Sequence, residues 1–351
     1  MMKTNRLTNL SSFESLAPGK ASSTLRVAYP PNRAAHPTLA DGLHAADAKI
    51  KSILVPLDGS AFAEQAIPLA LGIAEQSGAV LNLVHAFVPA EVLDPYDALH
   101  FVDVSRKSLK YDKHRYLADV VDKIAATSSV FVASRVSDGR AVPSSLNKIP
   151  GLDADLVVMA THGRGALGRF WSGSVAHSLL QRTNVPVILV RGTDDPVAFN
   201  AKTVEHVLLP LDGSEASEKV LRPIMDLGIF PAARHSLLHV VPLVPKHVAH
   251  GYTIRTDWVS SRRNWTAGMQ YLHPLARTLR ANNRRVHTKV VSSDEPVGQV
   301  VLRTAEEDDV GLIAVTYHRQ WSLARLLWPN TSEYLFRNSS RPIMFVPSDL
   351  P

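Results

Sequence analysis

The sequence predicts an α/β fold of two tandem, doubly wound domains, each built on a parallel β-sheet. Three observations predict it: the chain repeats itself once, short β-rich runs alternate with longer amphipathic stretches, and several short runs are apolar throughout. A run such as LVVMA at 156–160 indicates a strand covered on both faces, as in a parallel sheet. Strands that alternate with crossover helices then give the doubly wound arrangement.

The repeat divides the chain into two domains. Four segments recur in the same order, 154 to 156 residues further on: ILVPLDGSAFAEQAIPLAL (53–71) as VLLPLDGSEASEKVLRPIM (207–225), LNLVHAFVP (81–89) as SLLHVVPLVP (236–245), DLVVMATHGR (155–164) as VGLIAVTYHR (310–319), and VPVILV (185–190) as RPIMFV (341–346). This constant order and spacing indicates a duplicated domain. We expect an N-terminal extension at 1–49, domain 1 at 50–192, a polar linker at 193–203 and domain 2 at 204–348.

The elements of the first copy follow from its periodicity. Strands are expected at about 52–57, 80–87, 130–136, 154–160 and 186–190, with helices between them, among them 61–77 and 105–126. Pro186 and Pro342 stand at the start of the final strand of each copy, where a strand tolerates proline. Both final strands are apolar edges, and an unpaired apolar edge is a liability. We therefore expect the two domains to pair inside one chain, and the sequence leaves further homo-oligomerisation open.

Composition excludes several classes of protein. The 351 residues are 45% hydrophobic and include no cysteine, so disulfides and thiolate metal sites are excluded, and a reducing, cytoplasmic setting is expected. No stretch approaches the roughly 18 apolar residues of a membrane helix, so no membrane partner is expected. Residues 1–49 are rich in Ser, Pro, Ala and basic residues without apolar periodicity, which predicts disorder. A transit peptide is the weaker alternative, because Glu14 and the lack of an amphipathic pattern count against it.

The net charge of +6 comes partly from one region of the second copy. Its arginines are Arg255, Arg262, Arg263, Arg277, Arg280, Arg284 and Arg285. They form either a solvated helix face or a patch that binds a polyanion. No nucleic-acid-binding module accompanies them, so no nucleic-acid partner is expected.

The stretch ATHGRGALGRFWSGSVAHSLL (160–180) contains two competing glycine patterns. Gly163, Gly165 and Gly168 form a G-x-G-x-x-G, but a dinucleotide fingerprint follows the first strand and has an acid about 20 residues later, and neither holds here. In the second pattern nine residues separate Gly163 from Gly173-Ser174, where a new helix is expected to start. A helix start preceded by glycine offers free N–H groups to a phosphate. The alternative is that both glycines serve only as turn and helix entry.

With VPLDGS after the first strand, LVHA in the second and ATHG…GSVA after the fourth, both repeats resemble universal stress protein domains. The resemblance implies a five-stranded parallel sheet of order 3-2-1-4-5 in each domain. It also implies a site for ATP, alone or together with Mg²⁺, because ATP-binding members carry G-x2-G-x9-G-[S/T]. Gly163, Gly173 and Ser174 match that motif, whereas Ala160 replaces its first glycine.

The resemblance assigns the site residue by residue. Pro56, Asp58 and the backbone near Ala86 are expected to hold adenine and ribose. The phosphates are expected to lie against Ala160, Thr161, His162, Gly163, Arg164, Gly165, Ala166, Gly173, Ser174, Val175 and Ala176. Asp58 stands just before a helix, so it can also serve as a helix cap. His162 is a candidate general base, but we favour a structural or ribose-contacting role.

The second copy lacks these features, so we expect one nucleotide per chain, in domain 1. Val315 and His318 align with Ala160 and Gly163, and Pro329-Asn330 replaces Gly173-Ser174. Neither a Walker-type lysine motif nor an S-G-G-x-D-S loop is present, so we expect no enzymatic activity beyond slow ATP hydrolysis. Histidines 235, 239, 247 and 250 suggest a metal site. However, residues four apart in a strand lie about 13 Å apart, which is too far for them to share a metal ion, so no metal site is expected. The function predicted is an adenine-nucleotide-binding stress-response protein; the alternatives are a nucleotide-free interaction scaffold and an enzyme of the related α-hydrolase-like class.

Overall fold

A computed structural model describes residues 50–87, 98–138, 153–162, 174–192, 204–243, 245–247, 254–318 and 331–349. The predicted disordered extension (1–49), the linker (193–203) and the glycine loop (163–173) lie outside the described residues. Histidine 250 and residues Pro329 and Asn330 lie outside them as well.

The elements of the first half follow the predicted alternation of strands and helices. They are β1 (Ser52–Leu57), α2 (Ala61–Glu64), α3 (Ile67–Ser77), β2 (Val80–Phe87), α4 (Ala98–Ala125), β3 (Val132–Asp138), β4 (Leu156–His162), α6 (Ser174–Arg182) and β5 (Val187–Gly192).

The second half repeats this order and adds a short hairpin, β8 with β9, before its long helix. Its elements are β6 (His206–Pro210), α7 (Glu215–Glu218), α8 (Leu221–Asp226), β7 (Arg234–Pro242), β8 (Pro245–His247), β9 (Ile254–Thr256), α9 (Trp258–Ala281), β10 (Arg285–Ser293), α10 (Val297–Glu307), β11 (Leu312–Tyr317), α11 (Thr331–Asn338) and β12 (Ile343–Pro347).

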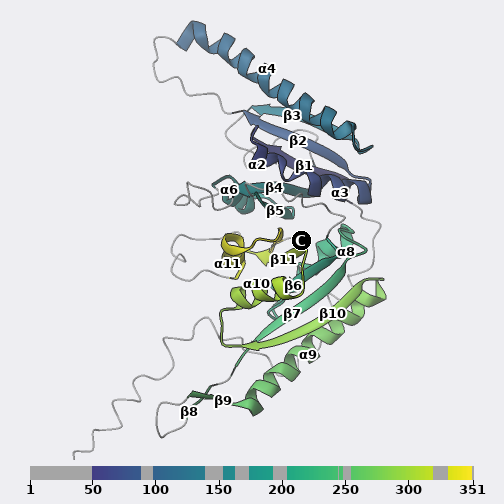
Figure 1. The fold of residues 1–351 in the computed structure, drawn as a ribbon, viewed down its shortest axis with the longest axis vertical. Helices are drawn as coiled ribbons and strands as arrows, with labels where there is room; N and C mark the ends of the chain where they lie inside the picture. The colour runs from purple at the N-terminus through teal and green to yellow at the C-terminus, as the bar shows by residue number, and fades with distance from the viewer. Residues whose placement is uncertain are drawn as a thin grey trace, which may run out of the picture. The chain divides into compact units, whose positions relative to one another are not determined.

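Both halves contribute five strands to one ten-stranded sheet (Figure 1), in the order β10-β7-β6-β11-β12-β5-β4-β1-β2-β3. Within each half every pair is parallel and the order is 3-2-1-4-5, which confirms the predicted fold class. The halves join through an antiparallel pair between β12 and β5, in which Phe345 lies opposite Val187 and Ile343 opposite Leu189. The prediction that the two final strands pair inside one chain is therefore confirmed.

Hydrophobic side chains cover both faces of the sheet. On β5, Ile188 and Val190 belong to the core under α3, α4, α8 and α9, whereas Val187 and Leu189 belong to the core under α6, α10 and α11. Because successive strand residues point to opposite faces, an apolar run such as LVVMA fills both cores at once. No helix of the described chain combines the length and the apolar character that crossing a bilayer requires.

One predicted helix is divided in two. The stretch 61–77 was expected to be continuous, but α2 ends at Glu64 and α3 begins at Ile67. Pro68 stands in the first turn of α3, where its missing N–H costs nothing, whereas inside a continuous helix it would remove a hydrogen bond. Ser60 caps α2 by accepting from the backbone N–H of Ala63, and Gly78, with φ +75°, ends α3.

Polar contacts add to the junction between the halves. The hydroxyl of Tyr317, on β11, donates a buried hydrogen bond to the carbonyl oxygen of Leu180 in α6. The Nη2 of Arg191, on β5, donates to the carbonyl oxygen of Arg337 in the last turn of α11, over 2.6 Å. An arginine at a helix C-terminus also interacts favourably with the helix dipole. The junction thus combines strand pairing, apolar packing and side chains that reach across it.

Candidate functional site

The candidate site lies where β1 and β4 are neighbours. Ile53 pairs with Leu156 and Leu54 with Val157, and the same register places Leu57 level with Ala160. After β1 the chain enters the helices of one face, and after β4 it enters α6 on the other face. Ligands of open α/β sheets bind at such a change of winding direction, outside the carboxyl ends of the strands. The backbone of the two predicted motifs is therefore brought to one edge of the sheet.

Asp58 is part of a tight turn directly after β1. Its Oδ1 accepts hydrogen bonds from the backbone N–H of Ser60 (2.9 Å) and from the Ser60 hydroxyl (2.6 Å). Gly59 has φ +89°, a conformation that a residue with a Cβ adopts only with strain. The helix cap is therefore Ser60, and Asp58 fixes the turn that presents it. The Asp58 side chain remains exposed at the edge of the sheet.

Pro56 and Ala86 occupy adjacent strands near this turn. Pro56 is buried in β1 and pairs with Val84 of β2. Two residues further along β2, the backbone of Ala86 pairs with Ser137 of β3. Both therefore lie at the end of β1 and β2 that carries Asp58.

Other predicted site residues lie on β4 and α6. Ala160, Thr161 and His162 end β4, paired with Val190, Arg191 and Gly192 of β5. Helix α6 begins at Ser174, as the sequence predicts, and continues through Val175 to Ala176, which is buried. Of the remaining predicted contacts, Gly163, Arg164, Gly165, Ala166 and Gly173 lie outside the described residues.

Four side chains near Asp58 were not predicted as site residues. His85, level with Leu57 on β2, is buried and meets the ring of Tyr116 edge to face, with centroids 5.8 Å apart. The Tyr116 hydroxyl donates to Glu64 Oε1 over 3.0 Å. Burial and that carboxylate raise the pKa of Tyr116, so it stays a donor. A Cβ on Gly59 would lie 3.7 Å from His85 Nε2 and 3.9 Å from Lys113 Nζ, which places both groups beside the turn.

The second half repeats most of this arrangement. Asp212 Oδ1 accepts from the N–H and hydroxyl of Ser214, and the His239 and Tyr271 rings lie 5.4 Å apart. Burial alone would raise the pKa of Asp212, but the hydrogen bonds from Ser214 and the nearby His239 hold it below its usual value. The repeat itself could have identified the set, because Glu218, His239 and Tyr271 follow Glu64, His85 and Tyr116 by 154 or 155 residues.

The halves differ at two places on this edge. At the position of Lys113 the second half has Gly268, where a Cβ would lie 2.9 Å from the His239 ring, so no side chain fits. His318, which aligns with Gly163, bonds through Nδ1 to the Ser348 hydroxyl over 2.8 Å. No group of His, Asp and Glu suited to a metal ion occurs among the described residues.

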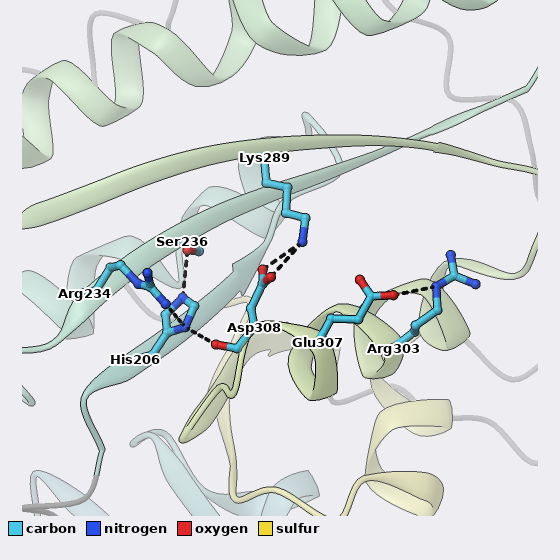
Figure 2. Close-up of polar contacts among 7 residues, drawn as sticks. All are labelled: His206, Arg234, Ser236, Lys289, Arg303, Glu307 and Asp308. Atoms are coloured by element: carbon cyan, nitrogen blue, oxygen red, sulfur yellow. Dashed lines mark hydrogen bonds and ion pairs between the residues drawn. The ribbon is translucent and has the colours of Figure 1, made fainter.

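A second polar cluster lies at the opposite end of the second half's strands (Figure 2). His206 Nε2 lies 2.7 Å from the Ser236 hydroxyl, while its Nδ1 lies 2.9 Å from Arg234 Nη2 and 3.1 Å from the carbonyl oxygen of Asp308. The Asp308 carboxylate pairs with Lys289 at 2.8 Å. Burial lowers the pKa of His206, and the Arg234 cation acts in the same direction. Ser236 is only 2% exposed, so no substrate reaches its hydroxyl, and the cluster is structural.

A groove of about 310 Å³ lies between α3 and α4. Its apolar lining includes Ile67, Leu71 and Val120. Glu64, Glu75 and Lys123 also line it, and two carboxylates against one ammonium group disfavour a phosphate. The groove is therefore a poor candidate for an anionic ligand.

Comparison with known proteins identifies relatives of the whole chain and of its single halves. The sequence model of the universal stress protein family matches residues 49–191 and again 203–347. A universal stress protein from Mycolicibacterium smegmatis is 30% identical over 308 residues, which cover 84% of this chain and 96% of that protein. One from Thermus aquaticus is 32% identical over 142 residues, 40% of this chain and 98% of that protein. The crystal structure of a universal stress protein from Archaeoglobus fulgidus matches with a TM-score of 0.60 and 17% identity, covering 87% of this chain and 98% of that one.

Proposed function

Because the chain belongs to the universal stress protein family, we propose that it is an adenine-nucleotide-binding regulatory protein of the stress response, with one nucleotide site in its first half. The observation that carries the proposal is the meeting of two motifs at one edge of the sheet. Asp58 follows β1, and the glycine motif begins after the neighbouring strand β4. This is the position at which open α/β sheets bind their ligands.

The proposed contacts come from two groups of residues, one at the ends of β1 and β2 and one after β4. Pro56, Asp58 and the backbone near Ala86 hold adenine and ribose. Residues 160–166 and 173–176 hold the phosphates, because a helix start that follows glycine directs N–H groups at an anion. Mg²⁺ would accompany ATP through phosphate and water oxygens rather than through a protein cage.

Ala160 is compatible with this role. It replaces the first glycine of the motif, and such a replacement is tolerated where the backbone does not need a positive φ. Among the described residues the non-glycine positions with positive φ are Phe230, Asn283 and Asp309, and Ala160 is not one of them. Its methyl group adds bulk near the ribose without straining the chain.

The proposed protein is a binder rather than an enzyme. Hydrolysis of the phosphoanhydride bond of ATP needs a group that activates or positions water beside the phosphates. His85 is buried against Tyr116, and Glu64 is engaged by the Tyr116 hydroxyl, so neither is arranged to do this. We expect hydrolysis to be slow or absent. By family resemblance and composition we place the protein in the cytoplasm.

The alternative is a nucleotide-free interaction scaffold of the same fold. It is favoured by one observation: Asp58 Oδ1 is engaged by Ser60, as Asp212 Oδ1 is by Ser214 in the half that lacks the glycine motif. The turn alone therefore does not require a ligand.

The two functions are separated by the nucleotide content of the purified protein. Nucleotide released by denaturation should be identified by mass as ATP, ADP or AMP, and calorimetry with Mg·ATP should give close to one site per chain. Gly173→Asp should abolish binding because it places a negative charge beside the phosphates, whereas Asp212→Ala should leave binding intact. A preparation that carries no nucleotide and ignores added ATP supports the scaffold; two sites per chain would contradict the assignment to the first half.

A further inference from the structure

Helix α9 and strand β10 carry basic charge alone. Between Trp258 and Ser293 the sequence has no Asp or Glu, but it contains Arg262, Arg263, Arg277, Arg280, Arg284, Arg285 and Lys289. The matching helix of the first half, α4, mixes both signs: Arg106, Lys107, Lys110, Lys113, Arg115 and Lys123 with Asp103, Asp112, Asp119 and Asp122. A helix face can be solvated by acidic or by basic side chains. The acids of α4 show that a helix at this position of the fold accepts them. The exclusion of acids from α9 therefore calls for a different explanation.

Four arginines of α9 share its exposed face. Arg262, Arg263, Arg277 and Arg280 are exposed, while Leu272, Ala276 and Leu279 are buried against the sheet. Figure 1 shows α9 running along β10, the outermost strand of its half. At a rise of about 1.5 Å per residue, the track from Arg262 to Arg280 is about 27 Å long. We call these four arginines the α9 arginine track.

Within the described part of the chain, most of the track is not neutralised by acidic side chains. Of the ion pairs between described residues, none involves Arg262, Arg263 or Arg277. Arg280 donates through Nε and Nη2 to the carbonyl oxygen of Val286, which fixes its guanidinium without cancelling its charge. The track thus presents uncompensated positive charge, which favours an extended anionic partner.

A fixed aromatic ring lies beside the track. Trp265, one helical turn from Arg262, keeps 43% of its surface exposed. Its Nε1–H donates to the carbonyl oxygen of Val290 over 3.2 Å, so the indole is tied to β10. Aromatic rings next to arginines are the combination that stacks unpaired bases while the cations hold the phosphates.

We propose that the α9 arginine track and Trp265 bind single-stranded nucleic acid. A polyanion-binding patch was one of the two interpretations of these arginines from the sequence, and nucleic acid was not expected because no nucleic-acid-binding module is present. The structure adds a shared exposed face, the absence of ion pairs for three of the arginines within the described chain, and a fixed ring. An anionic membrane fits less well, because the large apolar side chains exposed on α9 within the described chain are Val259 and Trp265 alone. This site is separate from the proposed nucleotide site and does not depend on it.

The test is fluorescence anisotropy of the full chain with labelled 20-nucleotide dT and U oligomers at 50 to 300 mM salt. If about four phosphates are contacted, log K should fall against log salt with a slope of about −3. Arg262→Glu with Arg263→Glu, and Arg277→Glu with Arg280→Glu, should each weaken binding at least tenfold. Trp265→Ala should weaken it several-fold and leave the salt slope unchanged, because stacking releases no counterions.

The matched control is Arg115→Glu with Lys123→Glu on α4, which changes the net charge by the same amount and should change the affinity less than twofold. Thermal unfolding of every variant, and Arg→Gln versions of both double variants, separate lost binding from lost folding. Failure to bind either oligomer at 50 mM salt overturns the proposal. So does an equal loss in the α4 control, or binding to phosphatidylserine vesicles in the absence of binding to oligomers.

Discussion

His235 makes the stability of the second half depend on pH. It is the second residue of β7 and is 1% exposed, and neither ring nitrogen meets a hydrogen-bond partner among the described residues. Burial lowers its pKa from 6.5 to about 4, and the nearby Arg284 acts in the same direction. The backbone of Arg285 and Ala233 favours the charged form, but the effect is too small to offset burial.

The direction of the pH effect follows from this lowered pKa. In the unfolded chain His235 takes up a proton below about pH 6.5, whereas in the folded chain it remains neutral down to about pH 4. Its contribution to stability is therefore complete above pH 6.5 and is lost as the pH falls toward 4. At about 1.4 kcal/mol per pKa unit the full loss is about 3 kcal/mol, of which about 2 kcal/mol is lost by pH 5. Burial lowers the pKa of His206 and His239 too, so both add to the loss.

His235→Leu removes the titrating group and keeps an apolar side chain of similar size. At pH 8 the free energy of unfolding should stay the same or rise by about 1 kcal/mol, because a buried polar group without a partner is costly. Between pH 8 and pH 5 the variant should lose about 2 kcal/mol less than the parent. The measurement is urea unfolding followed by circular dichroism at both pH values.

The control for this variant is His114→Leu, since His114 is exposed on α4 in the first half. It should keep the pH dependence of the parent. A loss of more than about 2 kcal/mol at pH 8 in His235→Leu would show that the ring has partners that stabilise the fold. An unchanged pH dependence would refute the low pKa.

Three further predictions test packing, the junction and the proposed nucleotide site. Gly298→Ala places a Cβ 2.5 Å from the Tyr334 ring, so the free energy of unfolding measured in urea titrations should fall by about 2 kcal/mol. Adding Tyr334→Ala in the same chain should recover part of that loss, because it removes the two ring atoms nearest the new methyl group. Tyr317→Phe leaves the Leu180 carbonyl without its donor and should lower the free energy of unfolding by about 1–2 kcal/mol; an unchanged value would mean that the contact adds nothing to the junction. Lys113→Ala should weaken Mg·ATP binding several-fold in calorimetry, whereas Lys123→Ala should not, and equal affinities would remove Lys113 from the site.

The architecture could be predicted because it depends on patterns that recur along the chain. Two copies of one strand order, each ending in an apolar strand such as 186–190, leave two apolar edges that pair, and the β5–β12 pair confirms it. The break between α2 and α3 was missed because the apolar positions of 61–77 continue through it. Pro68 was the available signal, since proline is favoured in the first turn of a helix and disfavoured inside one.

The residues of the candidate site could be predicted where they stand in a local motif or recur between the two copies. Asp58 and Ser174 mark turns and helix starts, which depend on a few neighbouring residues. The contact between Glu64 and Tyr116 joins residues 52 positions apart, and the local sequence around either residue does not indicate its partner. Such pairs depend on how the helices pack against the sheet, which hydrophobic periodicity does not determine.

The differences between the halves have a common physical reason. In the second half Tyr317 occupies the place of His162, and its hydroxyl crosses to α6 instead of facing a ligand edge. Thr316 accepts from Ser332 at the start of α11, over 2.7 Å, so the end of β11 is tied to its own helix. A ligand loop needs backbone that is free to approach a phosphate, whereas a junction needs backbone that is bonded and covered. The end of β11 in the second half therefore supports the pairing of the two domains, whereas the end of β4 in the first half carries the ligand site that we propose.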